Sequence, residues 1–188
     1  MMQRIIIVAI ALGFALAMDA FAVSIANGMK EPKMAKKKAV FIALSFGVFQ
    51  GAMPFVGYLL GSFLLSKIEW IIPYIALILL TYLGIKMIID GCSNKEEIND
   101  DLKIKVILIQ AIATSIDALS VGFTISNYSL LESFITCVCV MLITGILCLI
   151  GVLMGERLGN KLKGKAVIVG GIILILIGLE IFIGGVFF

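Results

Sequence analysis

The chain of 188 residues is 62% hydrophobic, has a mean hydropathy of +1.19 and carries a formal net charge of only +3. Soluble domains are about 45–50% apolar, so a soluble fold of this size could not bury so much apolar surface, and an integral membrane protein is expected. The sequence contains no histidine, which excludes the commonest general base and transition-metal ligand. Its lysines form short clusters rather than a basic domain, which argues against nucleic-acid binding.

Six segments are each long and apolar enough to cross a membrane, which takes about 20 residues. In chain order they are residues 5–27, 39–65, 71–89, 104–127, 130–154 and 166–188. The connections are short, so residues 1–188 are expected to form a single all-α membrane domain. The longest connection, residues 92–103, is charged and lacks apolar periodicity, and it is expected to be a solvated cytoplasmic linker.

The first span contains a carboxylate, Asp19, within the stretch AMDAFAVSIANG. The face that carries Asp19 and Asn27 otherwise bears mostly small residues, which let helices approach closely. The second span carries Gln50, Met53, Pro54, Gly57 and Gly61 along one stripe, and Gly51 beside it. Pro54 has no N–H, so it frees a backbone carbonyl that can act as a ligand. Structural roles are expected for four residues of this span: Gly51, Pro54, Gly57 and Gly61.

The third span carries Lys86 one turn before Asp90, and a snorkelling lysine paired with Asp90 is the simpler interpretation. The fourth span has polar residues spaced by 4, 3, 3 and 4 positions, which places them on one helical face: Gln110, Thr114, Asp117, Ser120 and Thr124. The fifth span carries three glycines with expected structural roles: Gly145, Gly151 and Gly155. The sixth carries Glu180, which is expected to line the outer half of a pathway.

The orientation follows from the basic residues. The loops after the first, third and fifth spans carry five, three and four of them, whereas the opposite side has only Arg4 and Lys67. Basic loops face the cytoplasm, so both termini are expected outside.

The two halves of the chain match each other. At an offset of 98 residues, Asp19 aligns with Asp117 and Ala15 with Ala113. At an offset of 94, the glycines of the second span align with those of the fifth: Gly51 with Gly145, Gly57 with Gly151 and Gly61 with Gly155. Each copy has an odd number of spans, so the second must cross the membrane in the opposite sense. The predicted fold is six transmembrane helices in two inverted three-helix repeats, residues 1–91 and 104–188, a plan that places transport sites near the midplane.

Both aspartates lie deep in the membrane on this topology. At about 1.5 Å per residue, Asp19 is about 12 Å and Asp117 about 20 Å from the cytoplasmic ends of their spans. A charge at that depth costs about 2.5–3.5 kcal/mol, so two at equivalent positions indicate a function. Carboxylate, amide, hydroxyl and carbonyl oxygens suit Mg²⁺, Ca²⁺ or Mn²⁺, and a methionine sulfur would favour Mn²⁺. The alternative is a structural pair of protonated carboxyls hydrogen-bonded to Ser or Gln.

We therefore predict Asp19 and Asp117 as metal ligands. Further candidates for metal binding or for lining the pathway are Asn27, Gln50, Met53, Gln110, Thr114, Ser120, Thr124 and Glu180.

Four motifs resemble those of the MntP-type manganese efflux pumps of bacteria: AMDAFAVSIANG, FGVFQGAMPFVGYLLG, AIATSIDALSVGFTI and GGIILILIGLEI. The resemblance covers essentially the whole chain. It implies a six-helix exporter in the bacterial inner membrane, with Mn²⁺ as transported substrate and no permanently bound cofactor. It also places the family's two intramembrane aspartates at Asp19 and Asp117. Glu180 departs from the family pattern, in which a basic or amide residue is expected.

Other functions stay open at this point: export of another divalent cation or of a basic amino acid, and a sporulation-related membrane protein of the same fold. An intramembrane aspartyl protease would carry YD and GxGD motifs, whereas the aspartates here lie in MD and ID, so no enzymatic activity is expected. Membrane lipid is an expected partner. The coupling ion and the oligomeric state are left open, with a homo-oligomer as one alternative.

Overall fold

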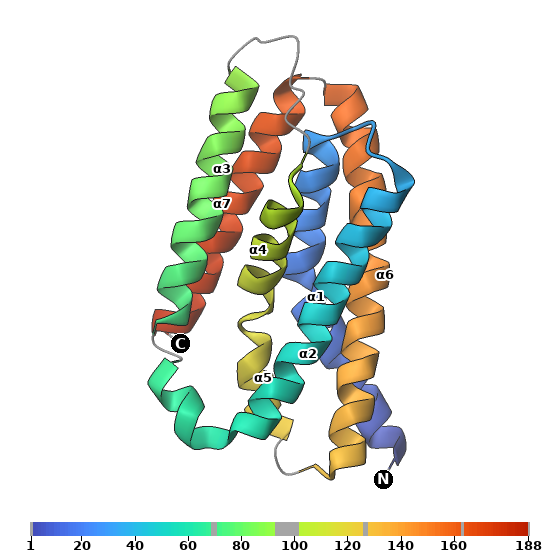
Figure 1. Ribbon diagram of the computed structural model, residues 1–188, viewed down its shortest axis with the longest axis vertical. Coiled ribbons are helices and arrows are strands. Elements are labelled where there is room, and N and C mark those ends of the chain that lie inside the picture. The colour runs from blue at the N-terminus through green and yellow to red at the C-terminus, as the bar shows by residue number, and fades with distance from the viewer. Residues whose placement is uncertain (1, 69–70, 93–101, 126–127, 163, 188) are drawn as a thin grey trace.

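The computed structural model describes residues 2–68, 71–92, 102–125, 128–162 and 164–187. They form α1 (Met2–Lys30), α2 (Lys36–Ile68), α3 (Ile72–Cys92), α4 (Ile104–Ser115), α5 (Ala118–Thr124), α6 (Leu130–Leu162) and α7 (Gly164–Phe187), as Figure 1 shows. Within these ranges there is no strand, so the all-α prediction is confirmed.

Four stretches of the described chain are long and apolar enough to cross a membrane: Ile5–Lys30, Lys36–Leu59, Leu130–Leu162 and Lys165–Gly184. They lie in α1, α2, α6 and α7, and they make the protein a multi-pass membrane protein. The predicted third span corresponds to a shorter apolar stretch of α3, Pro73–Ile89.

The fourth span is not the single helix that its apolar length predicts. It is divided into α4, which ends at Ser115, and α5, which begins at Ala118. Two hydroxyl groups at the end of α4 bond to carbonyls of their own helix, Thr114 to Gln110 at 3.0 Å and Ser115 to Ile112 at 3.1 Å. Such bonds compete with the helical ladder. Beyond the break, the N–H groups of Leu119 and Ser120 bond to carbonyls three residues back instead of four. Asp117 therefore lies in a turn between two helices.

The burial pattern differs from that of a soluble protein in its apolar outer surface and its buried polar side chains. Large apolar side chains are exposed on the outer surfaces of the helices, as at Leu44, Ile78 and Leu142. Polar side chains are buried between the helices, and those of Asn27 and Gln50 are fully buried. Because lipid solvates apolar groups and cannot hydrogen-bond polar ones, this pattern is the one expected for a bundle surrounded by lipid.

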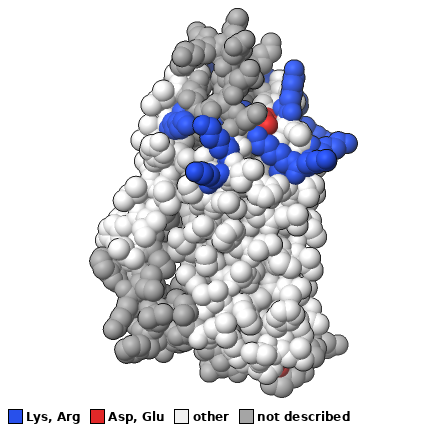
Figure 2. Space-filling model, in the orientation of Figure 1, with Lys and Arg blue, Asp and Glu red and all other residues white. Residues whose placement is uncertain are grey.

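Each helix packs against particular neighbouring helices. α1 lies along α6, α2 lies against α5 and α6, and α3 lies beside α7 (Figure 1). The largest apolar core draws residues from α1, α2, α3, α4, α6 and α7. Lysine and arginine side chains gather at one end of the molecule, which we call the basic end (Figure 2). The N-terminus lies at the opposite end (Figure 1).

In two of these helix pairs, the backbones of the two helices come into close contact at a glycine residue. A β-carbon on Gly57 of α2 would collide with the carbonyl oxygen of Leu119 and crowd the α-carbon of Gly122 in α5. A β-carbon on Gly151 of α6 would come within 2.8 Å of the carbonyl oxygen of Phe21 and crowd Ser24 in α1. Close backbone approach of this kind stabilises helix packing in membranes, where there is no hydrophobic driving force between helices.

Candidate metal site

Asp19 lies within the uninterrupted helix α1, and its side chain is half-buried. The neighbouring Leu16, Ala17 and Ala20 are buried, which turns this side of α1 toward the protein interior. Met18, by contrast, is 58% exposed on the outer surface, so its sulfur lies on the face of α1 that points away from the bundle.

Asp117 lies in the turn between α4 and α5. Its carboxylate accepts a hydrogen bond from the backbone N–H of Ala118, the first residue of α5. Its second oxygen, Oδ1, is buried and has no hydrogen-bond partner. A carboxylate oxygen without a donor is costly in an apolar interior, so this atom is suited to meet a cation.

The structure brings the two aspartates together. Leu16, one turn before Asp19, packs in one apolar cluster with Ala118, the residue after Asp117. Val140 of α6 belongs to the same cluster, and the half-buried Met53 of α2 packs against it. The two carboxyl groups are close enough to repel each other electrostatically. The separate spans that carry them therefore pack against each other beside the two aspartates.

The two carboxylates alone do not make a complete metal-binding site. In the parts of the chain that the structure describes, no three His, Cys, Asp or Glu side chains gather closely enough to hold a metal ion. A divalent cation here would need further oxygen ligands from amides, hydroxyls, the backbone or water.

Several buried oxygens are available for this purpose. Gln50 of α2 donates from Nε2 to the carbonyl of Leu16 at 2.9 Å, whereas its own Oε1 has no partner. Because Pro54 has no N–H, the backbone carbonyl of Gln50 also lacks its usual helical partner. An unsatisfied buried polar atom costs about 1–3 kcal/mol, so this arrangement is unfavourable unless the oxygens bind something.

Thr144 of α6 is a residue that the sequence reasoning missed. Its side chain is fully buried and its hydroxyl has no hydrogen-bond partner. The signal that could have found it is the internal repeat, because Thr144 stands 94 residues after Gln50, at the offset of the glycine matches.

The other predicted residues are distributed along the bundle. Asn27 and Gln110, both fully buried, bond to each other toward the basic end of the molecule. The hydroxyl of Thr114 bonds to its own helix, and Ser120 is half-buried. Gly61 lies in α2 and Thr124 in α5, but the surroundings of Gly61 and the side chain of Thr124 are outside the described part of the structure.

Glu180 is exposed on α7 and lines an open, mostly apolar groove of about 450 Å³ together with Leu176, Leu179, Ile183 and Gly184. It is close enough to Asp19 for the two carboxylates to repel each other. Lys86 is half-buried on α3.

The predicted glycines differ in how tightly they are packed. A β-carbon on Gly51 or Gly155 would lie against the backbone of the neighbouring helix, that of Cys137 or Ile25, respectively. At Gly145 it would meet only the carbonyl oxygen of Ala43, at an ordinary contact distance of 3.5 Å. Pro54 is buried in α2 and does not interrupt that helix.

Comparisons with a family model and with individual proteins point to the same family. The model of a family described as "Putative manganese efflux pump" matches residues 33–182. Proteins named "Putative manganese efflux pump MntP" are 40% identical in Campylobacter hominis and in Methanosphaera stadtmanae. These alignments cover 92% and 93% of this chain and 94% and 97% of the relatives. A relative of the same name in Methanobrevibacter smithii is 37% identical, over 97% of this chain and 100% of its own length.

No solved structure matches the chain. The family model spans most of the sequence, and the relatives align with nearly all of it. The chain therefore belongs to the MntP family of manganese efflux pumps.

Proposed function

We propose that this protein exports Mn²⁺ from the cytoplasm and that Asp19 and Asp117 bind the ion near the middle of the membrane. The observation that carries the proposal is the meeting of these two carboxylates inside a bundle whose outer surface is apolar, in a chain of the MntP family. A charged pair in such a place is expensive unless it serves an ion.

The proposed ligand set combines the two carboxylates with neutral oxygens. The side-chain oxygens that are buried without hydrogen-bond partners include Asp117 Oδ1, Gln50 Oε1 and Thr144 Oγ1. Hard oxygen ligands suit Mn²⁺ and related cations. The half-buried Met53, which packs against the cluster beside the aspartates, could add a sulfur that distinguishes Mn²⁺ from Mg²⁺ and Ca²⁺.

The basic end is proposed to face the cytoplasm, which would put both termini outside the cell. Its exposed basic side chains include Lys33, Lys37, Lys103 and Arg157. The bias of basic residues toward this end supports the orientation. Glu180, which lies further from the basic end than Asp19 does, would then stand on the outward side of the aspartates.

The chain is further proposed to consist of two inverted repeats, residues 1–91 and 104–188, joined by a linker at 92–103. The contacts at glycine support it. Gly57 meets Leu119 and Gly122, and Gly151 meets Phe21 and Ser24. Gly57 corresponds to Gly151 at the offset of 94, and Phe21 and Ser24 correspond to Leu119 and Gly122 at the offset of 98. Equivalent residues thus make equivalent contacts.

A second set of contacts follows the same rule. Gly51 lies against the carbonyl of Cys137, and Gly145 lies against the carbonyl of Ala43. At the offset of 94 residues, Gly51 corresponds to Gly145 and Ala43 corresponds to Cys137, so the two contacts are equivalent in the two repeats. Inverted repeats of this kind support alternating access, in which the site opens to each side of the membrane in turn.

The experiment that tests the site uses asparagine at each aspartate. Asn keeps the size and one oxygen of Asp but removes the charge. Asp19→Asn and Asp117→Asn are therefore each expected to abolish manganese export. Both variants should still fold, because a neutral amide is cheaper to bury than a carboxylate. The measurement is the manganese content and growth, in excess Mn²⁺, of a pump-deficient strain that expresses each variant, normalised to the amount of protein in the membrane.

Glu132→Gln is a matched control, because it removes a carboxylate at the end of the bundle opposite the basic end. A merely structural pair of carboxyls predicts a different outcome: less protein in the membrane, with normal export per molecule. Full rescue by either asparagine variant at normal expression would refute the site. Parallel cultures in excess Mg²⁺ or lysine test whether another divalent cation or a basic amino acid is the substrate.

A further inference from the structure

The end of α1 and the start of α4 are joined by a buried pair of amides. Asn27 donates from Nδ2 to Oε1 of Gln110 at 2.8 Å, and both side chains are fully buried. Asn27 lies about 12 Å along α1 from Asp19, and Gln110 about 10 Å along the chain from Asp117, both toward the basic end. The pair therefore lies between the two aspartates and the basic end of the molecule.

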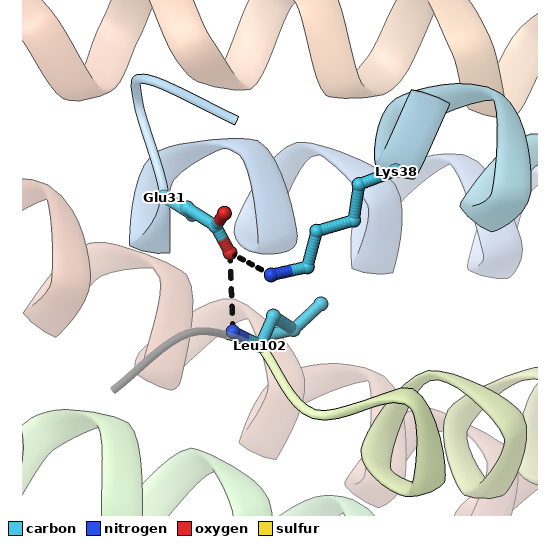
Figure 3. A network of polar contacts seen from close by, with 3 residues as sticks. All are labelled: Glu31, Lys38 and Leu102. Atoms are coloured by element: carbon cyan, nitrogen blue, oxygen red, sulfur yellow. Dashed lines mark hydrogen bonds and ion pairs between the residues drawn. The ribbon is translucent and has the colours of Figure 1, made fainter. Parts of the chain in front are cut away.

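A second contact joins the same two parts of the chain closer to the surface. The carboxylate of Glu31 binds the ammonium of Lys38 and accepts a hydrogen bond of 3.1 Å from the backbone N–H of Leu102 (Figure 3). The N–H of Glu31 bonds to the carbonyl of Asn27 at 3.1 Å, so Glu31 continues the turn that carries Asn27. The two contacts form successive layers, with Asn27–Gln110 inside and Glu31–Leu102 outside.

The inner layer is unusual for a permanent core contact. The residues around it in the bundle core are apolar, among them Val23, Ala26, Ile107 and Ala111. Asn27 Oδ1 has no partner there, and an apolar pair of the same size would avoid that unsatisfied atom. A contact that has to open to water benefits from polar groups, because water can replace their hydrogen bonds, whereas opening an apolar contact exposes surface that water disfavours. Both layers therefore suit a contact that opens and closes.

We propose that these two layers are the gate between the aspartate site and the basic end. In this structure the gate is closed. Separation of the end of α1 from the start of α4, with loss of the Asn27–Gln110 and Glu31–Leu102 bonds, opens the site toward the basic end. The inference rests on the proposed function, since it assumes that an ion passes between the aspartates and this end.

Cysteine labelling of purified protein in lipid nanodiscs tests the gate without any measurement of transport. All native cysteines, Cys92, Cys137, Cys139 and Cys148, are replaced by alanine. Thr114→Cys then places a single thiol on α4 between Gln110 and Asp117, at a position that is fully buried. Its rate of reaction with a membrane-impermeant thiol reagent reports access past the gate.

Glu31→Ala removes the acceptor of the Leu102 N–H and is expected to raise this rate about tenfold, the shift in population that the loss of one hydrogen bond to a charged group produces. Lys38→Gln removes the ammonium that binds the Glu31 carboxylate and should act in the same direction. Both residues are only partly buried, so the variants should fold. Asn27→Ala and Gln110→Ala are expected to act in the same direction. Glu132→Gln removes a carboxylate that accepts the N–H of Ser129 at the opposite end, and it should leave the rate unchanged.

Thr136→Cys is the matched control reporter. Like Thr114, Thr136 is buried and bonds to a carbonyl of its own helix, but it lies near the opposite end of the bundle. A faster reaction at position 114 with no change at position 136 supports the gate. An unchanged rate at position 114 in all the gate variants, or an equal increase at both positions, overturns it. Failure of manganese export by the wild-type protein would refute the proposed function and leave this readout intact.

Discussion

At the scale of single residues, Asp19 and Asp117 are held in different ways. Asp19 projects from an uninterrupted helix, whereas Asp117 lies in a turn where a backbone N–H already binds its carboxylate. The remaining oxygen of Asp117 and those of Gln50 and Thr144 are buried without partners. Polar atoms left in this state lower the stability of the protein, and binding of an ion would compensate for that loss.

Thr144 and Thr136 form a matched pair on α6 that separates these effects. Both are buried, but the hydroxyl of Thr136 bonds to the carbonyl of Glu132 at 2.9 Å, whereas that of Thr144 has no partner. Thr136→Val should lower the free energy of unfolding by about 1 kcal/mol and leave manganese export unchanged. Thr144→Val should leave stability unchanged or raise it and reduce export several-fold, as measured by thermal unfolding in detergent and by ion flux. Normal export with Thr144→Val would remove this hydroxyl from the ligand set.

How far the sequence predicts the site can be judged from these residues. Asp19 and Asp117 are conspicuous because charges are rare in apolar spans, so sequence alone marks them as candidates. Thr144 lies in no polar stripe, since its neighbours on α6 are apolar, and only the internal repeat points to it. The pairing of Asn27 with Gln110 depends on how α1 and α4 pack, which a spacing rule along a single helix cannot give.

At the scale of elements, helix length follows from apolar composition, whereas the interruption at Asp117 does not. The predicted spans agree with the helices to within a few residues at most ends because the apolar runs end in charged loops. The break between α4 and α5 lies beside two side-chain hydroxyls that bond to backbone carbonyls, and such bonds weaken the helical ladder. It separates the stripe of polar residues, expected on one continuous face, into two short helices that meet at the carboxylate.

Helix packing at glycine allows a prediction at this scale. A β-carbon on Gly151 would come within 2.8 Å of the carbonyl of Phe21, whereas one on Gly145 would meet only the carbonyl of Ala43 at 3.5 Å. Gly151→Ala should therefore lower the free energy of unfolding by about 1–3 kcal/mol through overpacking of α6 on α1. Gly145→Ala, the same change two turns away, should be tolerated. Equal melting temperatures for the two variants in detergent would contradict the proposed close packing of α1 and α6.

At the scale of the whole molecule, basic side chains mark one end and the N-terminus lies at the other (Figures 1 and 2). This asymmetry is what the positive-inside rule uses to orient a membrane protein. The contacts between α1 and α6 resemble those between α5 and α2 at matched positions, as the proposed two-fold arrangement of the repeats requires. A site at the boundary of two such halves can be opened from either side.

The orientation can be tested with two exposed positions. Lys37 lies at the basic end and Ser129 in the connection between α5 and α6 at the opposite end. With the native cysteines replaced, Ser129→Cys should react with an impermeant thiol reagent in intact cells, and Lys37→Cys only after the membrane is opened. The reverse labelling pattern would invert the proposed topology and, with it, the direction of transport through the site.

The measurement that tests the central claim most directly is Mn²⁺ flux by the purified protein in proteoliposomes, with and without a pH gradient. The wild-type protein should move Mn²⁺ across the membrane. Asp19→Asn and Asp117→Asn should each reduce the flux to that of protein-free liposomes, and Glu132→Gln should transport as the wild type does. Flux at the wild-type rate in either asparagine variant would contradict the claim that these two carboxylates bind the transported ion.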